Sequence, residues 1–170
     1  MGYGYDKKDI KDIADSLGSD SGYQLTGGFA RIKNRGEVVE NFKVENKLYF
    51  VCLLSDSGVS TKECFKAYDE DNYSGVLSNN DELISSLIKG DIKETAKNLN
   101  NALMAPAFKL NNEIKKNLEV LKSLNPLVVS MTGSGATVFS IYENEELSKW
   151  AYDKLKKQNY NVLLLSSENS

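Results

Sequence analysis

The sequence predicts an α+β fold whose larger part has a ferredoxin-like split βαβ arrangement. From residue 47 onward the predicted elements run strand, helices, strand, strand, helix, strand, an order typical of an antiparallel sheet with helices packed on it. The unbroken apolar run Leu48–Leu54 is typical of a strand covered on both faces. The segment 1–46 is instead predicted to form only short strands, and a sheet of such strands is marginally stable unless further strands complete it. We therefore expect a C-terminal domain over 47–165 with inserted helices, an incomplete piece of another domain over 1–46, and a frayed tail at 166–170.

The first predicted element is an amphipathic helix. Asp6 is its expected N-cap and Gly18 its expected end. Its apolar residues recur with the helical period on one face, at Ile10, Ile13, Ala14 and Leu17. Beyond Asp20 the pattern predicts short strands at 23–25, 29–33 and 37–39.

The middle of the chain is predicted to be helical. Residues that favour a helix N-terminus precede three segments: Ser60 or Thr61, Asn79 with Glu82, and Asp91 with Glu94. The third helix is expected to run towards Met104 and to end at Pro106. A fourth helix carries an apolar stripe from Leu110 to Leu121 and ends near Pro126.

The C-terminal third predicts two strands, one helix and a last strand. The two strands, 127–131 and 136–142, are joined by Thr132-Gly-Ser-Gly135. The helix has an apolar stripe of Leu147, Trp150, Ala151 and Leu155. The last strand is expected at 162–165.

Composition excludes several classes of protein. The 170 residues carry a net charge of −3, which argues against a nucleic-acid partner, and no apolar run has the length of a membrane span. The chain contains no histidine and two cysteines, so Ser-His-Asp and Cys-His catalysis, histidine-rich zinc and iron sites and a four-cysteine zinc site are excluded. We expect a reduced, cytoplasmic protein without a resident metal site, whose oligomeric state the sequence leaves open.

The segment Ser130–Phe139 contains the strongest local motif. It is interpreted either as a glycine-rich hairpin turn or as an anion cradle. In the second interpretation the glycines Gly133 and Gly135 turn backbone N–H groups towards one point, and the hydroxyls of Thr132 and Ser134 add donors.

Two further positions have both a structural and a functional interpretation. Asp20, in the segment Leu17-Gly-Ser-Asp-Ser-Gly22, is either a turn residue or a general base. Phe65, one turn beyond the helix start at Thr61, is expected to pack in the core; the alternative is a ring that stacks on a planar ligand.

Four segments in this order resemble the 4-diphosphocytidyl-2-C-methyl-D-erythritol kinases, in the superfamily of galactokinase, homoserine kinase, mevalonate kinase and phosphomevalonate kinase. They are Leu17–Asp20, Gly27–Glu37, Gly58–Thr61 with Phe65, and Met131–Phe139. The resemblance covers essentially the whole chain, from about residue 7 to about residue 165. It implies that this chain corresponds to the C-terminal part of such a kinase, because nothing in it matches the family's catalytic lysine or main ATP-phosphate loop. Ser21-Gly22-Tyr23 stands where the family usually has Val-Pro-Phe, and Ser55-Asp56-Ser57 where it often has a proline.

The resemblance also implies a reaction, with ATP and Mg²⁺ as cofactors and a cytidine-diphosphate-linked methylerythritol as substrate. Asp20 would accept the proton of the 2-hydroxyl as it attacks the γ-phosphate. Thr61 and Phe65 would lie on the substrate side, and Thr132, Gly133, Ser134 and Gly135 beside the phosphates. Alone, the chain is expected to be inactive. The alternatives are a homoserine- or mevalonate-type kinase and a non-catalytic ligand-binding or regulatory module.

Overall fold

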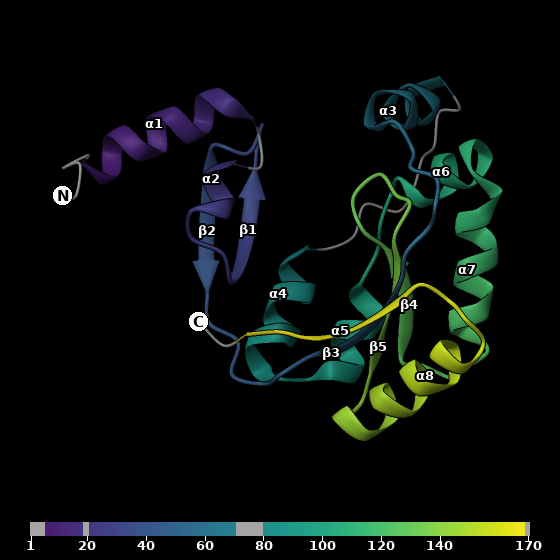
Figure 1. Cartoon of the computed structure of the whole chain (residues 1–170). Helices are drawn as coiled ribbons and strands as arrows, with labels where there is room; N and C mark the ends of the chain where they lie inside the picture. The colour runs from purple at the N-terminus through teal and green to yellow at the C-terminus, as the bar shows by residue number, and fades with distance from the viewer. Residues whose placement is uncertain (1–5, 19–20, 71–79, 169–170) are drawn as a thin grey trace, which may run out of the picture. The chain divides into compact units, whose positions relative to one another are not determined.

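The computed structural model describes residues 6–18, 21–70 and 80–168, and the chain divides into two compact units. Unit 1 comprises Met1–Glu45 with the C-terminal residues Glu168–Ser170, and unit 2 comprises Asn46–Ser167. Figure 1 shows the elements of both units.

Unit 1 contains two helices and a two-stranded antiparallel sheet. Its elements are α1 (Lys7–Leu17), α2 (Ser21–Gln24), β1 (Phe29–Lys33) and β2 (Val38–Phe42). The Asp6 carboxylate accepts a hydrogen bond from the Lys8 N–H, as expected for the cap of α1. The strand predicted at 23–25 is wrong, because this segment begins in α2 and ends in a turn. The Tyr23 carbonyl accepts hydrogen bonds from the N–H groups of Thr26 and Gly27.

Unit 2 has the predicted ferredoxin-like topology. Its strands lie in the order β4-β5-β3-β6, with every neighbouring pair antiparallel, as a split βαβ unit requires. Its elements are β3 (Tyr49–Leu53), α3 (Thr61–Glu70), α4 (Asn80–Lys89), α5 (Ile92–Asn98), α6 (Met104–Leu110), α7 (Asn112–Lys122), β4 (Val128–Met131), β5 (Val138–Tyr142), α8 (Glu145–Lys157) and β6 (Val162–Ser166). Helices α7 and α8 pack on the sheet, and α4 packs on α5.

One long helix of the prediction is two helices in the structure. The helix predicted from Asp91 towards Met104 ends at Asn98, whose side chain donates to the Glu94 carbonyl, 3.0 Å away. Pro106 does not close it but lies in the first turn of α6, where a missing N–H costs no helical hydrogen bond. Asn79, the expected cap of the preceding helix, lies outside the described residues.

Two predictions at the C-terminal end also need correction. The expected apolar stripe of α8 is only half buried, because Ala151 and Leu155 face the core while Leu147 and Trp150 are exposed. The last strand includes Ser166, which was expected in a frayed tail. The Ser167 N–H donates to the Leu48 carbonyl at 2.9 Å, and its hydroxyl accepts from the Leu48 N–H at 2.9 Å.

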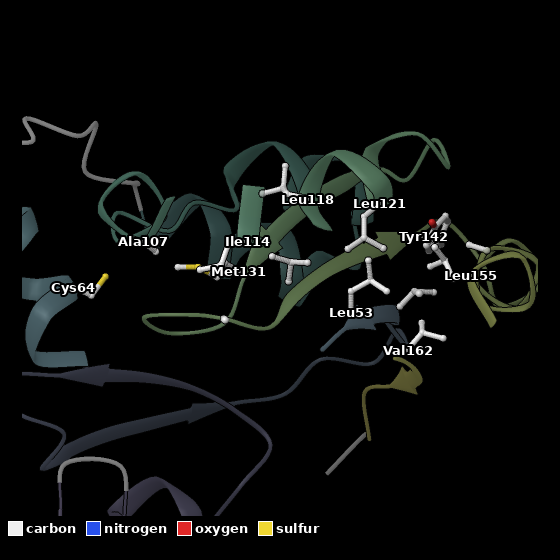
Figure 2. Close-up of a cluster of buried hydrophobic side chains, with 14 residues drawn as sticks. Leu53, Cys64, Ala107, Ile114, Leu118, Leu121, Met131, Tyr142, Leu155 and Val162 are labelled. Atoms are coloured by element: carbon white, nitrogen blue, oxygen red, sulfur yellow. The ribbon is translucent and has the colours of Figure 1, made fainter. Parts of the chain in front are cut away.

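The core of unit 2 fills the space between one face of its sheet and the helices. Cross-strand partners share a face, so Leu53 packs beside Val138 and Val162. Figure 2 shows the cluster running from Cys64 and Ala107 at one end to Leu155 and Val162 at the other. The glycine-rich segment between β4 and β5 therefore rests on a packed base.

Candidate functional site

The connection between β4 and β5 is a tight hairpin turn. The Gly135 N–H donates to the Thr132 carbonyl at 2.9 Å, which closes a four-residue turn. The Thr132 N–H donates to the Thr137 carbonyl at 3.0 Å and extends the ladder to the base of the turn. Gly133, the first central residue, has a φ of 51°, as a turn of type II′ requires.

The two glycines of this turn serve different physical needs. A Cβ at Gly133 would meet no atom within 4 Å, so this position is open. Gly135 has a φ of 102°, and a Cβ there would lie 3.0 Å from Ile114 Cδ1 and 3.1 Å from Met131 Sδ. Gly135 thus seats the loop on the core, while Gly133 leaves its outer side accessible.

Asn101 holds the same loop from outside the two strands. Its Nδ2 donates to the Met131 carbonyl at 2.8 Å and the Gly133 carbonyl at 2.9 Å, while its Oδ1 accepts from the Leu103 N–H at 2.9 Å. Asn101 is not among the predicted site residues, because the sequence pattern predicts a continuous helix there. The signal available was the run Asn98-Leu-Asn-Asn101, since asparagine favours caps and turns over helix interiors.

A second polar group supports the end of the loop. The Ser55 hydroxyl donates to the Ala136 carbonyl at 3.1 Å and accepts from Asn117 Nδ2 at 3.0 Å. Two residues further on, the Ser57 hydroxyl donates to Glu113 Oε2 at 2.9 Å. The Ser55–Ser57 segment is thus held by side-chain hydrogen bonds to α7.

The N-terminus of α3 meets the glycine loop. Thr61 Oγ1 and Ser134 Oγ lie 2.9 Å apart within hydrogen-bond distance, although 73 residues separate them in the chain. The Ser60 hydroxyl accepts from the Glu63 N–H at 3.4 Å, consistent with a cap at the helix start. The structure therefore brings together Thr61 and the predicted loop residues.

Phe65 lies one turn further along α3 and is exposed. Its side chain retains 51% of its accessible surface, so the expectation that it packs in the core is wrong. The neighbouring Cys64 occupies the core instead, fully buried against α6, with Sγ 3.7 Å from the Leu103 carbonyl. An exposed aromatic ring so close to a helix N-terminus is free to stack on a planar ligand.

The remaining predicted site residue, Asp20, lies outside the described residues. It belongs to unit 1, whereas Thr61, Phe65 and the glycine loop belong to unit 2. Its assignment as a general base therefore stays a prediction.

The chemical groups that unit 2 offers at the glycine loop are neutral hydrogen-bond donors. Among the described residues, the N–H groups of Gly133 and Ser134 have no hydrogen-bond acceptor, and the Ser134 hydroxyl lies within hydrogen-bond distance of the Thr61 hydroxyl. Burial raises the pKa of the Cys64 thiol, which disfavours the thiolate that a nucleophile needs. Among the described residues no three acidic or thiol side chains are grouped as a metal site.

Comparison with known families identifies the domain in unit 2. Residues 83–161 match the family described as GHMP kinases C terminal, so this part of the chain is a GHMP kinase C-terminal domain. No helix among the described residues combines the length and apolar character needed to cross a membrane.

Particular relatives narrow the resemblance. The chain is 30% identical to the 4-diphosphocytidyl-2-C-methyl-D-erythritol kinase of Carboxydothermus hydrogenoformans over 149 residues, which is 88% of this chain and 52% of that protein. A crystal structure of 4-(cytidine 5′-diphospho)-2C-methyl-D-erythritol kinase superposes with a TM-score of 0.78 at 22% identity, covering 95% of this chain and 58% of that one. The crystal structure of homoserine kinase from Cytophaga hutchinsonii superposes with a TM-score of 0.71 at 16% identity, covering 99% of this chain and 59% of that one. The chain thus spans about half the length of the curated relatives it matches.

Proposed function

We propose that this chain supplies the substrate-side helix and a phosphate-facing loop of an ATP-dependent kinase. Its substrate would be 4-diphosphocytidyl-2-C-methyl-D-erythritol, an intermediate of non-mevalonate isoprenoid biosynthesis, phosphorylated on the 2-hydroxyl. The observation that carries the proposal is the 2.9 Å approach of Thr61 Oγ1 to Ser134 Oγ, with the exposed Phe65 one helical turn beyond Thr61 on α3. It joins a site for a planar ring to a site for an anion, the two ends of a nucleoside diphosphate.

The glycine loop suits the phosphates of such a ligand. The N–H groups of Gly133 and Ser134 and the Thr61 hydroxyl are neutral donors at an open position. The space next to Gly133 Cα is open to at least 4 Å around a Cβ position, and Asn101 Nδ2 holds the carbonyls of Met131 and Gly133. Preorganised donors of this kind stabilise charge without rearranging.

The proposed reaction also needs a base and a nucleotide. Kinases of this family use ATP and Mg²⁺. We assign the base to Asp20, which would accept the 2-hydroxyl proton as that oxygen attacks the γ-phosphate and ADP leaves. The described residues contain no carboxylate cluster that fits Mg²⁺, so no step is assigned to the metal.

Phe65 separates this proposal from its alternatives. The aromatic ring of Phe65 can stack on the cytosine of the proposed substrate. Homoserine and mevalonate contain no planar ring on which it could stack. Stacking of a base on an aromatic side chain is worth about 1–3 kcal/mol. Phe65→Ala is therefore expected to weaken binding of cytidine diphosphate by about tenfold or more.

The test is calorimetric titration of this chain with cytidine diphosphate and, separately, with homoserine. Trp150→Ala is the matched control, because Trp150 is also an exposed aromatic on a helix of unit 2. Loss of cytidine diphosphate binding in Phe65→Ala and not in Trp150→Ala supports the proposal. Binding that is equal in both variants, or binding of homoserine instead, overturns the assigned substrate. The absence of cytidine diphosphate binding to the parent chain has the same consequence.

A further inference from the structure

The strand β6 forms one edge of the sheet of unit 2. In the order β4-β5-β3-β6 it pairs with β3 alone among the described residues. The Ser167 N–H donates to the Leu48 carbonyl, and backbone groups alternate along an antiparallel strand, so the odd-numbered residues of β6 bond to β3. The N–H and carbonyl groups of Val162, Leu164 and Ser166 therefore point outward from the edge.

The sequence of β6 lacks the features that normally protect an edge strand. It reads Val-Leu-Leu-Leu-Ser, with no charged residue and no proline. Leu163 and Leu165 are 42% and 49% exposed, on the face of the sheet opposite the core cluster that contains Val162. The edge strand β4 differs, because it has four residues and none of their side chains is exposed. An exposed apolar edge such as β6 is a template for pairing with another strand.

The two exposed leucines continue an apolar layer that exists already. Leu165 is the cross-strand partner of Phe50 on β3. The Phe50 ring in turn meets the Phe139 ring edge-on, with centroids 6.0 Å apart. A strand that carries apolar side chains on this face would therefore extend the layer beyond β6.

The backbone of β6 is complementary to a second copy of itself. Antiparallel pairing of two β6 strands about Leu164 places Val162 of one copy opposite Ser166 of the other, and Leu164 opposite Leu164. These are the residues whose N–H and carbonyl groups point outward, so all of those groups find partners. Leu163 then lies opposite Leu165 of the second copy, in the closely spaced kind of pair and on the exposed face.

Helix α8 brings charged side chains to the same edge. It lies over β6 and β3. Its first turn is level with the Ser166 end of β6, because it follows Tyr142, which is aligned through Tyr49 with Ser166. Its last turn leads to the Val162 end. The two turns carry opposite charges: Glu145 and Glu146 in the first, and Lys154, Lys156 and Lys157 in the last.

Two-fold symmetry about Leu164 makes these charges complementary. It sets the two copies of α8 antiparallel on one face of the joined sheet, with the acidic turn of each beside the basic turn of the other. Two strand spacings, about 10 Å, separate the helices, which is an ordinary helix-packing distance. Glu145 and Lys156 are eleven residues apart and share one face of α8. A right-handed crossover from β5 through α8 to β6 turns this face towards the edge.

We propose that this chain forms a homodimer through β6, in which two four-stranded sheets join into one continuous antiparallel sheet. The occupant of the edge is a second copy, because both the outward backbone groups and the charges of α8 match their own two-fold image. None of Thr61, Phe65 and the glycine loop belongs to this surface, so the dimer stands independently of the proposed function.

Sedimentation equilibrium of this chain over a range of concentrations tests the proposal. We expect a reversible equilibrium between monomer and dimer. Leu165→Lys should raise the Kd of the dimer at least about tenfold, because it places an ammonium group against Leu163 of the second copy, twice in each dimer. Leu165 is half exposed in the single chain, so the folded monomer tolerates the lysine.

Leu110→Lys is the matched control. Leu110 is a leucine of similar exposure, 44%, at the C-terminal end of α6, where a cation is favourable. The same helix carries Ala107, at the end of the core cluster remote from Val162 (Figure 2). The control should keep the Kd of the parent within about twofold. Circular dichroism verifies that both lysine variants retain the parent fold.

Charge reversal tests the antiparallel arrangement of the helices. Lys156→Glu should raise the Kd about fivefold, because carboxylates then meet between the two copies. Adding Glu145→Lys to this variant should return the Kd to within about twofold of the parent, because the pair forms again with reversed sign. The two positions are about 16 Å apart along one helix, so this restoration requires a contact between copies.

Four results overturn the proposal. The first is a parent chain that remains monomeric up to its limit of solubility. The second is a dimer that Leu165→Lys leaves unchanged, and the third is equal weakening by Leu165→Lys and Leu110→Lys. The fourth is a double charge reversal that fails to restore the Kd. A dimer that Leu165→Lys weakens, Leu110→Lys spares and the double reversal restores supports it.

Discussion

The two units of this chain treat similar amphipathic patterns differently. In unit 2 the stripe of α7 is buried at Ile114, Leu118 and Leu121 beneath the sheet. In unit 1 the stripe of α1 has the same period, yet Leu17 keeps 77% of its surface. The pattern makes a helix amphipathic in both cases, but only a covering layer converts it into stability.

The largest expected difference comes from truncating one leucine in each unit. Leu121→Ala should lower the free energy of unfolding of unit 2 by about 2–5 kcal/mol, because a cavity replaces a fully buried side chain. Leu17→Ala should change the free energy of unfolding by less than about 0.5 kcal/mol. Urea unfolding followed by circular dichroism measures both. Comparable losses in the two variants would mean that α1 is packed in solution.

Hydrogen exchange should separate the units without any substitution. Amides of β3, a central strand with partners on both sides, are expected to exchange about a hundredfold more slowly than those of β1 and β2. The reason is that a two-stranded sheet opens locally at small cost. Mass spectrometry on peptides covering 29–42 and 49–53 gives the comparison, and equal protection would remove the distinction between the units.

Within unit 2, alanine substitutions at the two loop glycines compare a packed position, Gly135, with an open one, Gly133. Gly135→Ala should cost about 1–3 kcal/mol of unfolding free energy, because its Cβ would press on Ile114 and Met131. Gly133→Ala should cost about 1 kcal/mol, from the positive φ alone. Unfolding followed by the fluorescence of Trp150, the one tryptophan of the chain, measures both. The reverse order would show that the loop is seated differently.

The smallest expected effect on the free energy of unfolding comes from Asn101, whose side chain holds the glycine loop. Asn101→Ala leaves the carbonyls of Met131 and Gly133 without their side-chain donor and should cost about 1 kcal/mol. Asn112→Ala, an exposed asparagine in the first turn of α7, should stay within about 0.5 kcal/mol of the parent. The same fluorescence measurement applies, and equal stability of the two variants would exclude a clamping role for Asn101.

The sequence by itself determined the strand order of unit 2, because its strands and its helices other than α5 and α6 carry strong local patterns. The run Leu48–Leu54 contains β3, and the hairpin around the glycine segment followed from Gly133 and Gly135. The candidate loop and the start of α3 at Thr61 were also identified from local chemistry and from the resemblance. Patterns of this kind are local, and local residues are sufficient to produce them.

Only the tertiary structure decided which of these residues meet and which remain exposed. The contact between Thr61 and Ser134 spans 73 residues, and no periodicity encodes such a pair. Phe65 is exposed and Cys64 buried because α6 packs on one side of α3, a relation that the sequence of α3 does not contain. Asn101 became a clamp because α5 ended early and left its amide beside two loop carbonyls. Burial depends on what other elements cover, so the period of a helix predicts its apolar face but not the neighbour that covers it.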